Sequence, residues 1–285
     1  MNNIAFIFCN TGRTAIRFLL PVFFLYINVF QIAANENYPL GSRPAAMGNA
    51  FVGISDIWSV HHNQAGLGRL RSFSAGFHHE NRFMVPEFGL QAVAGVMPVR
   101  PGTIGLSYTY FGYSRYNESK LGLAFGREFG ERFSAGLQVN YLYTYIAEDY
   151  GDTGSITVEG GFMVEPVDGL FVAAHLYNPT RTKRYTYYGE PVPTVLRFGI
   201  SGYLSERFLA AAEAEKDFDN RTVFKGGLEM SFMDSLWLRT GISTDPVQAS
   251  FGIGYAIGGL TADIAFTNHQ VLGLTPHFSI SYTFR

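Results

Sequence analysis

The amino-acid sequence predicts an all-β protein, a transmembrane antiparallel β-barrel of about 14 strands with a short helical plug ahead of the first strand. Large apolar residues alternate with small or polar ones over many segments of roughly ten residues, which is typical of strands with one face in lipid. The 285-residue chain is rich in aromatic residues (16%) and glycine (32 residues) and poor in charge (15%). Beyond residue 34 no segment approaches about 18 consecutive apolar residues, so any membrane crossing requires closed strands.

Residues 1–34 are predicted to be a signal peptide. Arg13 and Arg17 precede an apolar run from Phe18 to Ala34, which ends on small residues suited to cleavage. The alternative is a retained membrane anchor, because the run is about 17 residues long, the shortest length that can span a bilayer. A proline and an asparagine inside the run favour the signal peptide. Its removal also removes Cys9, the one cysteine of the chain, so no disulfide is expected.

Residues 35–70 are predicted to form a plug inside the barrel. Ser42 followed by Pro44 indicates an N-cap and an early-helix proline, so a short helix is expected to begin there. The segment is rich in small residues and precedes the first strand on the periplasmic side. It can therefore fold back and occlude the lumen.

The barrel itself is predicted to cover residues 71–285, with the first strand near residues 72–80. The clearest strand is the fifth, in which every odd position from Phe133 to Tyr145 is apolar or aromatic and most even positions are small or polar. Residues 224–232, 251–257 and 260–266 alternate in the same way. In each case the apolar set is expected to face lipid, because successive strand side chains point to opposite faces.

Turn lengths give an independent test of this topology. If both termini are periplasmic, every second connection is periplasmic and short. The loops between them are on average longer and include residues 148–154, 178–193 and 268–274. The short turns are predicted around Pro101, Glu131, Asp168, Glu206, Asp234 and Gly258.

The last strand carries a predicted assembly signal. Phe278, Ile280, Tyr282 and Phe284 alternate with polar residues up to the end of the sequence. This pattern resembles the C-terminal signal of bacterial outer-membrane barrels, which the barrel assembly machinery reads, although here Arg285 follows the final aromatic residue. We expect these four side chains to face outer-membrane lipid and this strand to pair with the first.

The plug segment carries a family resemblance of its own. The residues that carry it are Arg43, Met47, Gly48, Phe51, Asp56, Asn63, Ala65, Gly66 and Leu67. They look like the N-terminal signature of the FadL-like superfamily of long-chain fatty-acid transporters, which includes PorV- and PorQ-type relatives in Bacteroidetes. Asn49 and Gln64 stand where that signature has Gly and Pro. The resemblance implies a fourteen-strand barrel with an N-terminal plug, in agreement with the alternation.

The resemblance implies two functions. FadL-like members pass hydrophobic molecules such as fatty acids or aromatics across the outer membrane, whereas PorV- and PorQ-type members are non-enzymatic partners of the type IX secretion system. We predict the second role, a secretion-associated or surface-assembly partner. The hydrophobic conduit is the alternative, and a structural barrel without cargo is a third possibility.

The predicted lumen favours the partner role. With the apolar faces outward, seven charged side chains of both signs point inward: Glu159, Arg197, Glu213, Lys225, Glu229, Arg239 and Asp263. Charges in a confined lumen must be paired or hydrated, and a paired lattice is a poor path for hydrophobic cargo. The alternative interpretation is that these residues only fill and rigidify the lumen.

The longest outer loop is a candidate surface contact. It contains Arg181, Lys183, Arg184, Tyr185, Tyr187 and Tyr188. Interleaved Tyr and basic residues are enriched at binding hot spots. The simpler interpretation is an interfacial aromatic belt with basic residues near lipopolysaccharide.

Other classes of function have little support in the sequence. A net charge of −2 gives no basic face for nucleic acid. The Gly-x-Ser-x-Gly and His-Glu-x-x-His patterns of hydrolases are absent, so no enzyme activity, cofactor or metal is expected. His78 and His79 are adjacent in a strand and point to opposite faces, and His61-His62 has no obvious third ligand, so the histidines are interpreted as isolated.

Overall fold

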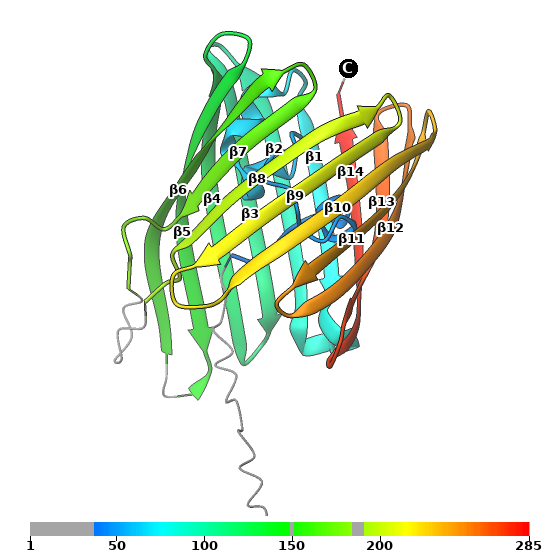
Figure 1. The fold of residues 1–285 in the computed structure, drawn as a ribbon. Coiled ribbons are helices and arrows are strands. Elements are labelled where there is room, and N and C mark those ends of the chain that lie inside the picture. Colours follow the sequence, from blue (N-terminus) through cyan, green and yellow to red (C-terminus); the bar gives the residue numbers. More distant parts are fainter. Residues whose placement is uncertain (1–36, 149–150, 184–190, 285) are drawn as a thin grey trace, which may run out of the picture. The chain divides into compact units, whose positions relative to one another are not determined.

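The computed structural model describes residues 37–285 except 149–150, 184–190 and 285. The described residues form a closed barrel of fourteen antiparallel strands, as predicted (Figure 1). The strands are β1 (Ser74–Asn81), β2 (Gly89–Val99), β3 (Gly102–Tyr113), β4 (Tyr116–Glu128), β5 (Phe133–Ile146), β6 (Gly151–Val167), β7 (Leu170–Tyr177), β8 (Val195–Ser205), β9 (Phe208–Asp217), β10 (Thr222–Met233), β11 (Leu236–Thr244), β12 (Val247–Ile257), β13 (Leu260–His269) and β14 (Gly273–Thr283).

The barrel closes between its first and last strands. β1 pairs antiparallel with β14 in a register that runs from Ser74 opposite Thr283 to Glu80 opposite His277. The predicted pairing of the last strand with the first is therefore confirmed. Closure leaves no unpaired sheet edge in the membrane, where unpaired backbone groups would find no water.

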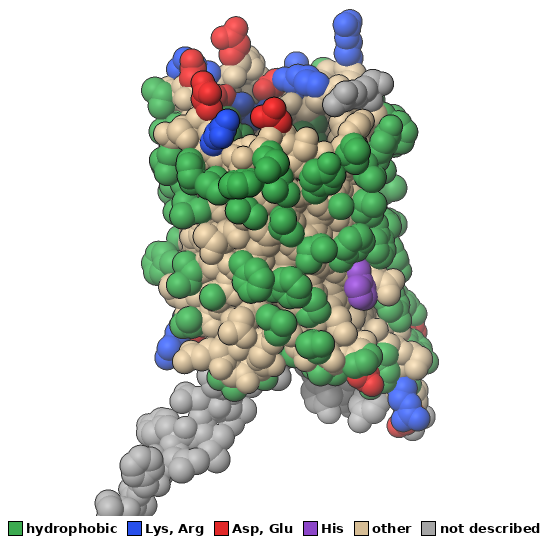
Figure 2. Space-filling model, turned by 90° about the vertical axis from the view of Figure 1, so that its right-hand side faces the viewer, with side chains coloured by type: hydrophobic (Ala, Val, Ile, Leu, Met, Phe, Trp, Pro, Cys, Tyr) green, Lys and Arg blue, Asp and Glu red, His purple; other side chains and the backbone are tan. Residues whose placement is uncertain are grey.

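The outer surface of the barrel is apolar. On β5, Leu137 is 72% exposed, whereas its neighbour Gln138 is 1% exposed and faces the lumen. Figure 2 shows hydrophobic side chains over the face of the barrel wall that is in view, with charged side chains gathered at its two ends. An apolar band between two polar rims is what a lipid bilayer requires of a spanning barrel. Among the described residues, no helix has the length and apolar character to cross a membrane.

Connections at the two ends of the barrel differ in average length. The longer ones lie at what we call the loop end, although residues 114–115 and 245–246 connect strands there as tightly as the turns at the opposite, turn end. The short predicted turns lie where expected, and the C-terminus is at the same end as these turns (Figure 1). Two outer loops are shorter than predicted, because β6 already begins at Gly151 and β13 runs to His269. Asp152 and Thr153 pair with Tyr145 and Thr144 of β5, since backbone pairing near the rim does not require apolar side chains.

The plug contains α1 (Ser42–Ala46), α2 (Ser59–His62) and the 3-10 helix η1 (Gln64–Arg69). Two further short 3-10 helices, η2 (Arg82–Met84) and η3 (Pro86–Phe88), lie in the loop between β1 and β2. Most plug residues are buried by the barrel wall around them. The hydrophobic core of the protein therefore lies between plug and wall, inside the barrel.

Candidate functional site

The plug is held by the inner wall of the barrel along its whole described length. Tyr38 lies at the loop end, with its ring 4.8 Å from that of Phe111 on β3. The chain then runs to the opposite, turn end of the barrel, where Arg69 forms an ion pair with Glu165 of β6 at 2.7 Å. The lumen is therefore occupied by protein, and any passage through it depends on the position of the plug.

Helix α1 begins one residue earlier than the sequence predicted. Its N-cap is Gly41 rather than Ser42. Gly41 has a φ of 98°, and a Cβ there would lie 2.7 Å from Cγ of Trp58, so glycine is required for both conformation and space. The backbone N–H of Ser42 donates to Oγ of Ser279 on β14 at 3.1 Å. A contact with the wall thus takes the place of a side-chain cap.

Glycines in the wall allow the plug backbone to touch the strands. A Cβ on Gly227 of β10 would lie 2.5 Å from the carbonyl oxygen of Met47, and one on Gly241 of β11 would lie 2.1 Å from the backbone nitrogen of Gly48. Both distances are too short for any side chain. Met47 and Gly48 of the family signature therefore mark the point where plug and wall are in backbone contact.

The remaining signature residues hold the plug in shape. The backbone N–H of Phe51 donates to Glu213 of β9 at 2.9 Å. Oδ1 of Asp56 accepts from the Trp58 N–H at 2.7 Å. Asn63 caps η1 through the N–H of Ala65 at 3.1 Å. The signature also includes Gly66, which packs on Ser59, and Leu67, which lies in the core against β4.

A charge network joins the plug to the wall near the turn end. The Arg43 guanidinium binds Glu229 of β10 with two contacts of 2.8 Å. Glu229 also accepts from Arg239 of β11 at 2.6 Å, and Arg239 pairs with Asp263 of β13 at 2.6 Å. Within the plug, Arg43 also contacts Asp56 at 3.2 Å. Five charged groups therefore form one chain from the plug across three strands.

The electrostatics of this network keep Arg43 charged. Burial lowers the pKa of Arg43, but Glu229 and Asp56 outweigh burial, so the pKa stays above its ordinary value. Burial raises the pKa of Asp56, and Arg43 opposes that rise. The plug thus contributes a permanent cation to a site that the wall supplies with carboxylates.

A second charge cluster lies on β8 to β10. Lys225 contacts Glu213 at 3.0 Å and Glu215 at 2.7 Å, and Arg197 contacts Glu215 at 2.8 Å. The sequence predicted inward-facing Arg197, Glu213 and Lys225. It also contains Glu215, two residues after Glu213 on β9 and on the same face of the strand, which the prediction omitted. Its alternation with Glu213 along the strand was the available signal.

A third cluster surrounds Glu159 of β6. Its Oε1 accepts from Lys120 at 2.9 Å, from Gln138 at 2.9 Å and from Asn140 at 2.8 Å. Its Oε2 lies 3.1 Å from Nε2 of His175 on β7. The sequence selected Glu159 but not its partners, because only the register of the paired strands β4 to β7 brings them around one carboxylate.

Two plug histidines lie close to these cations. Nε2 of His62 lies 2.8 Å from the carbonyl oxygen of Leu40. Burial and the nearby Arg197 lower the pKa of His62 to about 3. Burial also lowers the pKa of His61 well below its usual range. Both side chains are therefore neutral in the docked plug at ordinary pH.

One strand of the wall is apolar on its inner face. Leu90, Ala92, Ala94 and Val96 of β2 are each at most 6% exposed and face the lumen. We call these four residues the apolar lane; at about 3.3 Å per residue it is roughly 20 Å long. The sequence predicted a polar lumen, whereas the inner face of β2 is apolar along this length. Val93 and Met97 on the outer face of β2 are apolar as well.

The apolar lane is covered by the apolar side of the plug. It belongs to a single hydrophobic cluster with the plug side chains Leu40, Met47, Phe51, Ile54, Ile57, Trp58, Val60 and Leu67. In the circular strand order, β8 to β11 lie on the far side of the barrel from β2. The plug is therefore amphipathic, with apolar contacts on β2 and ion pairs on β10.

A cavity of about 670 Å³ opens beside the plug at the turn end. Its lining includes Arg43, Asp56, Glu229 and Arg239, together with the rim residue Arg207. The loop end instead carries an aromatic group, in which Arg82 lies 4.0 Å from the centre of the Tyr38 ring and Phe88 stacks on Phe111 at 6.4 Å. The two mouths of the lumen thus differ in polarity.

The other predicted contact residues lie on the outside. In the loop after β7, Arg181 and Lys183 are exposed, whereas Arg184, Tyr185, Tyr187 and Tyr188 lie outside the described residues. On β14, Phe278 and Tyr282 are 41% and 42% exposed and Ile280 is partly exposed, and Phe284 just after the strand is 47% exposed. The Phe284 ring lies 4.8 Å from that of Phe73, just before β1. The predicted assembly signal thus lies at the closing seam.

Comparison with known proteins identifies the fold. No protein-family description matches the sequence. No curated protein matches it either. Among solved structures, the CymD monoaromatic hydrocarbon channel superposes with a TM-score of 0.69 at 12% identity, over 86% of this chain and 98% of that one.

Two further structures agree. The Ralstonia pickettii toluene transporter TbuX gives a TM-score of 0.68 at 12% identity, over 88% of this chain and 100% of that one. A Pseudomonas aeruginosa FadL homologue gives 0.62 at 13% identity, over 87% and 98%. Identities this low establish the fold alone. The described residues form a fourteen-strand barrel that has the FadL-like fold.

Proposed function

We propose that this protein is a non-enzymatic, gated conduit for small hydrophobic molecules, such as aromatics or fatty acids, across the outer membrane. The observation that carries the proposal is the apolar lane on β2, which extends over roughly 20 Å of the inner wall. A barrel whose plug has only a structural role does not need a continuous apolar face on one strand of its inner wall. Structures of similar fold that are described as a monoaromatic hydrocarbon channel and a toluene transporter support the same class of cargo.

In this proposal the observed state is closed. The apolar side of the plug covers the lane, and Arg43 fastens the plug to Glu229 at the turn end. Movement of the plug would uncover an apolar surface large enough for a monoaromatic molecule. The charge clusters on β8 to β11 lie on the side of the lumen opposite β2. Cargo would therefore move along the apolar lane of β2, and the opposite wall would remain polar.

A cysteine lock tests the proposal within one protein. Ser42→Cys with Ser279→Cys would join the plug to β14, since the Ser42 nitrogen lies 3.1 Å from Oγ of Ser279. The chain from Asn35 onward has no other thiol. We expect cells that lack other channels of this fold to take up labelled toluene when they produce the reduced pair, and to lose that uptake when it is oxidised. The single variants Ser42→Cys and Ser279→Cys should respond to neither condition.

The result that would overturn the conduit is uptake by the wild type no faster than by cells without the protein. Uptake that persists after oxidation would instead reject plug movement as the gate. Both outcomes can be read from the same set of strains.

The secretion-associated or surface-assembly partner is the second candidate. The observation that favours it is the plug itself, which ion pairs and buried apolar contacts hold across the lumen. Purification from detergent extracts separates the two candidates. Recovery of secretion components with a chain that gives no toluene uptake would support the partner role. A structural barrel without cargo would give neither result.

A further inference from the structure

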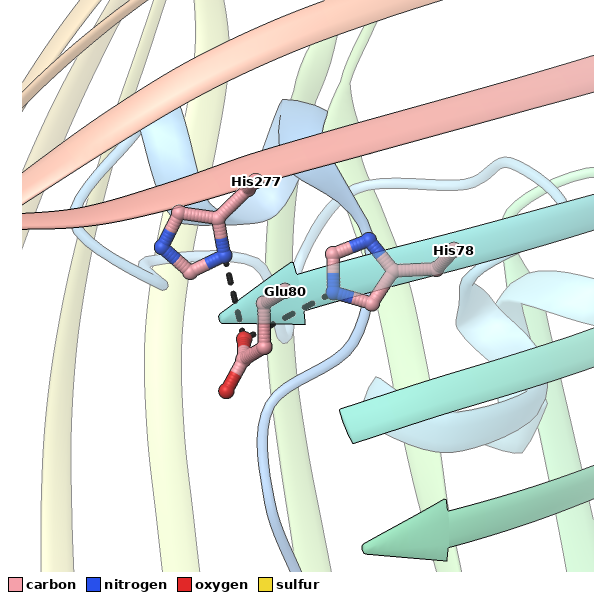
Figure 3. A group of neighbouring side chains, drawn as sticks. All are labelled: His78, Glu80 and His277. Atoms are coloured by element: carbon pink, nitrogen blue, oxygen red, sulfur yellow. Dashed lines mark ion pairs between the residues drawn. The ribbon is translucent and has the colours of Figure 1, made fainter. Parts of the chain in front are cut away.

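The closing seam of the barrel brings together Glu80 and two histidines, and the histidines were expected to be isolated. His78 and Glu80 are two residues apart on β1 and therefore point to the same face, into the lumen. His277 of β14 is the register partner of Glu80. Figure 3 shows the two imidazoles and the carboxylate pointing toward one another, with His277 contributed by the neighbouring strand.

The distances suit a shared metal ion. Oε2 of Glu80 lies 3.0 Å from Nδ1 of His277 and 3.6 Å from Nε2 of His78. The three ligand atoms all lie within 4.8 Å of one another. Ligands bound at about 2.1 Å in a tetrahedral site are separated by about 3.4 Å, so small side-chain rotations would complete the geometry.

The surroundings of the histidines point the same way. His78 is 0% exposed and His277 is 7% exposed. Neither ring nitrogen of His78 has a hydrogen-bond partner among the described residues. The other nitrogen of His277, Nε2, lies 2.9 Å from Oγ1 of Thr267, which orients the ring with Nδ1 toward Glu80. Metal-bound histidines usually have such a partner on the second nitrogen.

One neighbouring group opposes a cation. Arg82 contacts Oε1 of Glu80 through its Nε, while Oε2 remains directed at the two histidines. The guanidinium also stacks 4.0 Å from the centre of the Tyr38 ring. Arg82 therefore weakens cation binding without occupying the ligand positions, so its removal should strengthen binding.

We propose that His78, Glu80 and His277 bind one divalent transition-metal ion of the zinc class and thereby join the first and last strands across the lumen side of the seam. Two imidazoles and one carboxylate select zinc-like ions over Mg²⁺ and Ca²⁺, which prefer oxygen ligands. Because its three ligands come from β1 and β14, the ion would act as a clasp at the point where the barrel closes. This inference does not depend on the conduit proposal.

The test measures zinc bound to the folded, untagged chain in detergent after dialysis against a zinc buffer. We expect about one zinc ion per wild-type chain. His78→Gln and His277→Gln should each weaken binding at least about tenfold. The matched control is His79→Gln, because His79 is adjacent in sequence but lies on the outer face, and it should bind zinc as the wild type does. Ca²⁺ at the same concentration should not compete.

Two further measurements, on the wild type and on Arg82→Gln, test the metal site even if a histidine variant fails to fold. Co²⁺ added to the wild type should give the visible absorption of a nitrogen-bound, low-coordinate ion. Arg82→Gln should bind zinc about tenfold more tightly, because it removes a cation beside Glu80. Absence of zinc from the folded wild type would overturn the inference, as would equal zinc binding by His78→Gln and His79→Gln.

Discussion

Arg43→Gln should release the plug while the barrel stays closed. The guanidinium of Arg43 is the plug's cation in the network at the turn end, where it makes two contacts of 2.8 Å with Glu229. Glutamine keeps much of the side-chain length but removes the charge. Glu229 would keep its contact with Arg239 at 2.6 Å, so the variant does not strand a buried carboxylate.

The expected magnitude follows from these contacts. The side chains of Arg43 and Glu229 are 20% and 8% exposed, so solvent screens the pair only weakly. Two charge-assisted hydrogen bonds that share one acceptor group stabilise the docked plug by about 2–4 kcal/mol. The contact of Arg43 with Asp56 lies within the plug and does not contribute to docking. The population with the plug undocked should therefore rise about 30- to 900-fold.

Thiol labelling measures that population. Ala46→Cys places a reporter at a position that is 0% exposed and packs against Gly252 of β12 in the docked plug. A maleimide can react only when the plug leaves the wall, so its rate reports the undocked fraction. The matched control is Arg132→Gln, which breaks a surface pair whose side chains are 59% and 95% exposed. Such a pair contributes little, so labelling should not change.

The result that would refute this reasoning is a labelling rate in Arg43→Gln within threefold of the rate in Arg132→Gln. The plug would then be held by its apolar contacts with β2 alone. Heat-modifiable migration on gels should remain the same in both variants, because neither change touches the strand ladder.

Three further outcomes are expected. Burial and the nearby Arg197 lower the pKa of His62 to about 3 from 6.5, so its contribution to docking is complete above pH 6.5 and is lost as pH falls toward about 3. The labelling rate of the reporter, divided by the rate of a free thiol at the same pH, should therefore rise as the pH falls below 6.5. In His62→Gln the same ratio should depend less on pH. Identical pH profiles of the two proteins would contradict this effect. Gly241→Ala should raise labelling more than tenfold, since its Cβ would lie 2.1 Å from the plug backbone, whereas Gly95→Ala, with open space around it, should not. Phe284→Ala should lower the heat-modifiable fraction in cells because it removes the ring contact at the seam, whereas Val271→Ala in an exposed loop should leave it unchanged, and equal fractions would argue against a role for Phe284 in assembly.

Local pattern was sufficient for the architecture of this protein. Alternation is a property of each strand by itself, so residues such as Leu137 and Gln138 reveal which face meets lipid without knowledge of their neighbours. The short turns could also be predicted from local sequence alone. The aromatic residues at the end of the chain indicated that the last strand pairs with β1. Helix α1 was displaced by one residue because its start depends on a contact with Ser279, far away in the sequence.

The contents of the lumen depended on the tertiary structure. The sequence shows that Glu159 points inward, but its four partners come from β4, β5 and β7, and only the pairing of these strands sets the distances. Sequence alone determined that this protein is a barrel with an apolar exterior, because alternation repeats every two residues. The fold decided that β2 is apolar inside, that Arg43 reaches Glu229 and that His78 meets His277, because contacts between distant segments exist only once the barrel has closed.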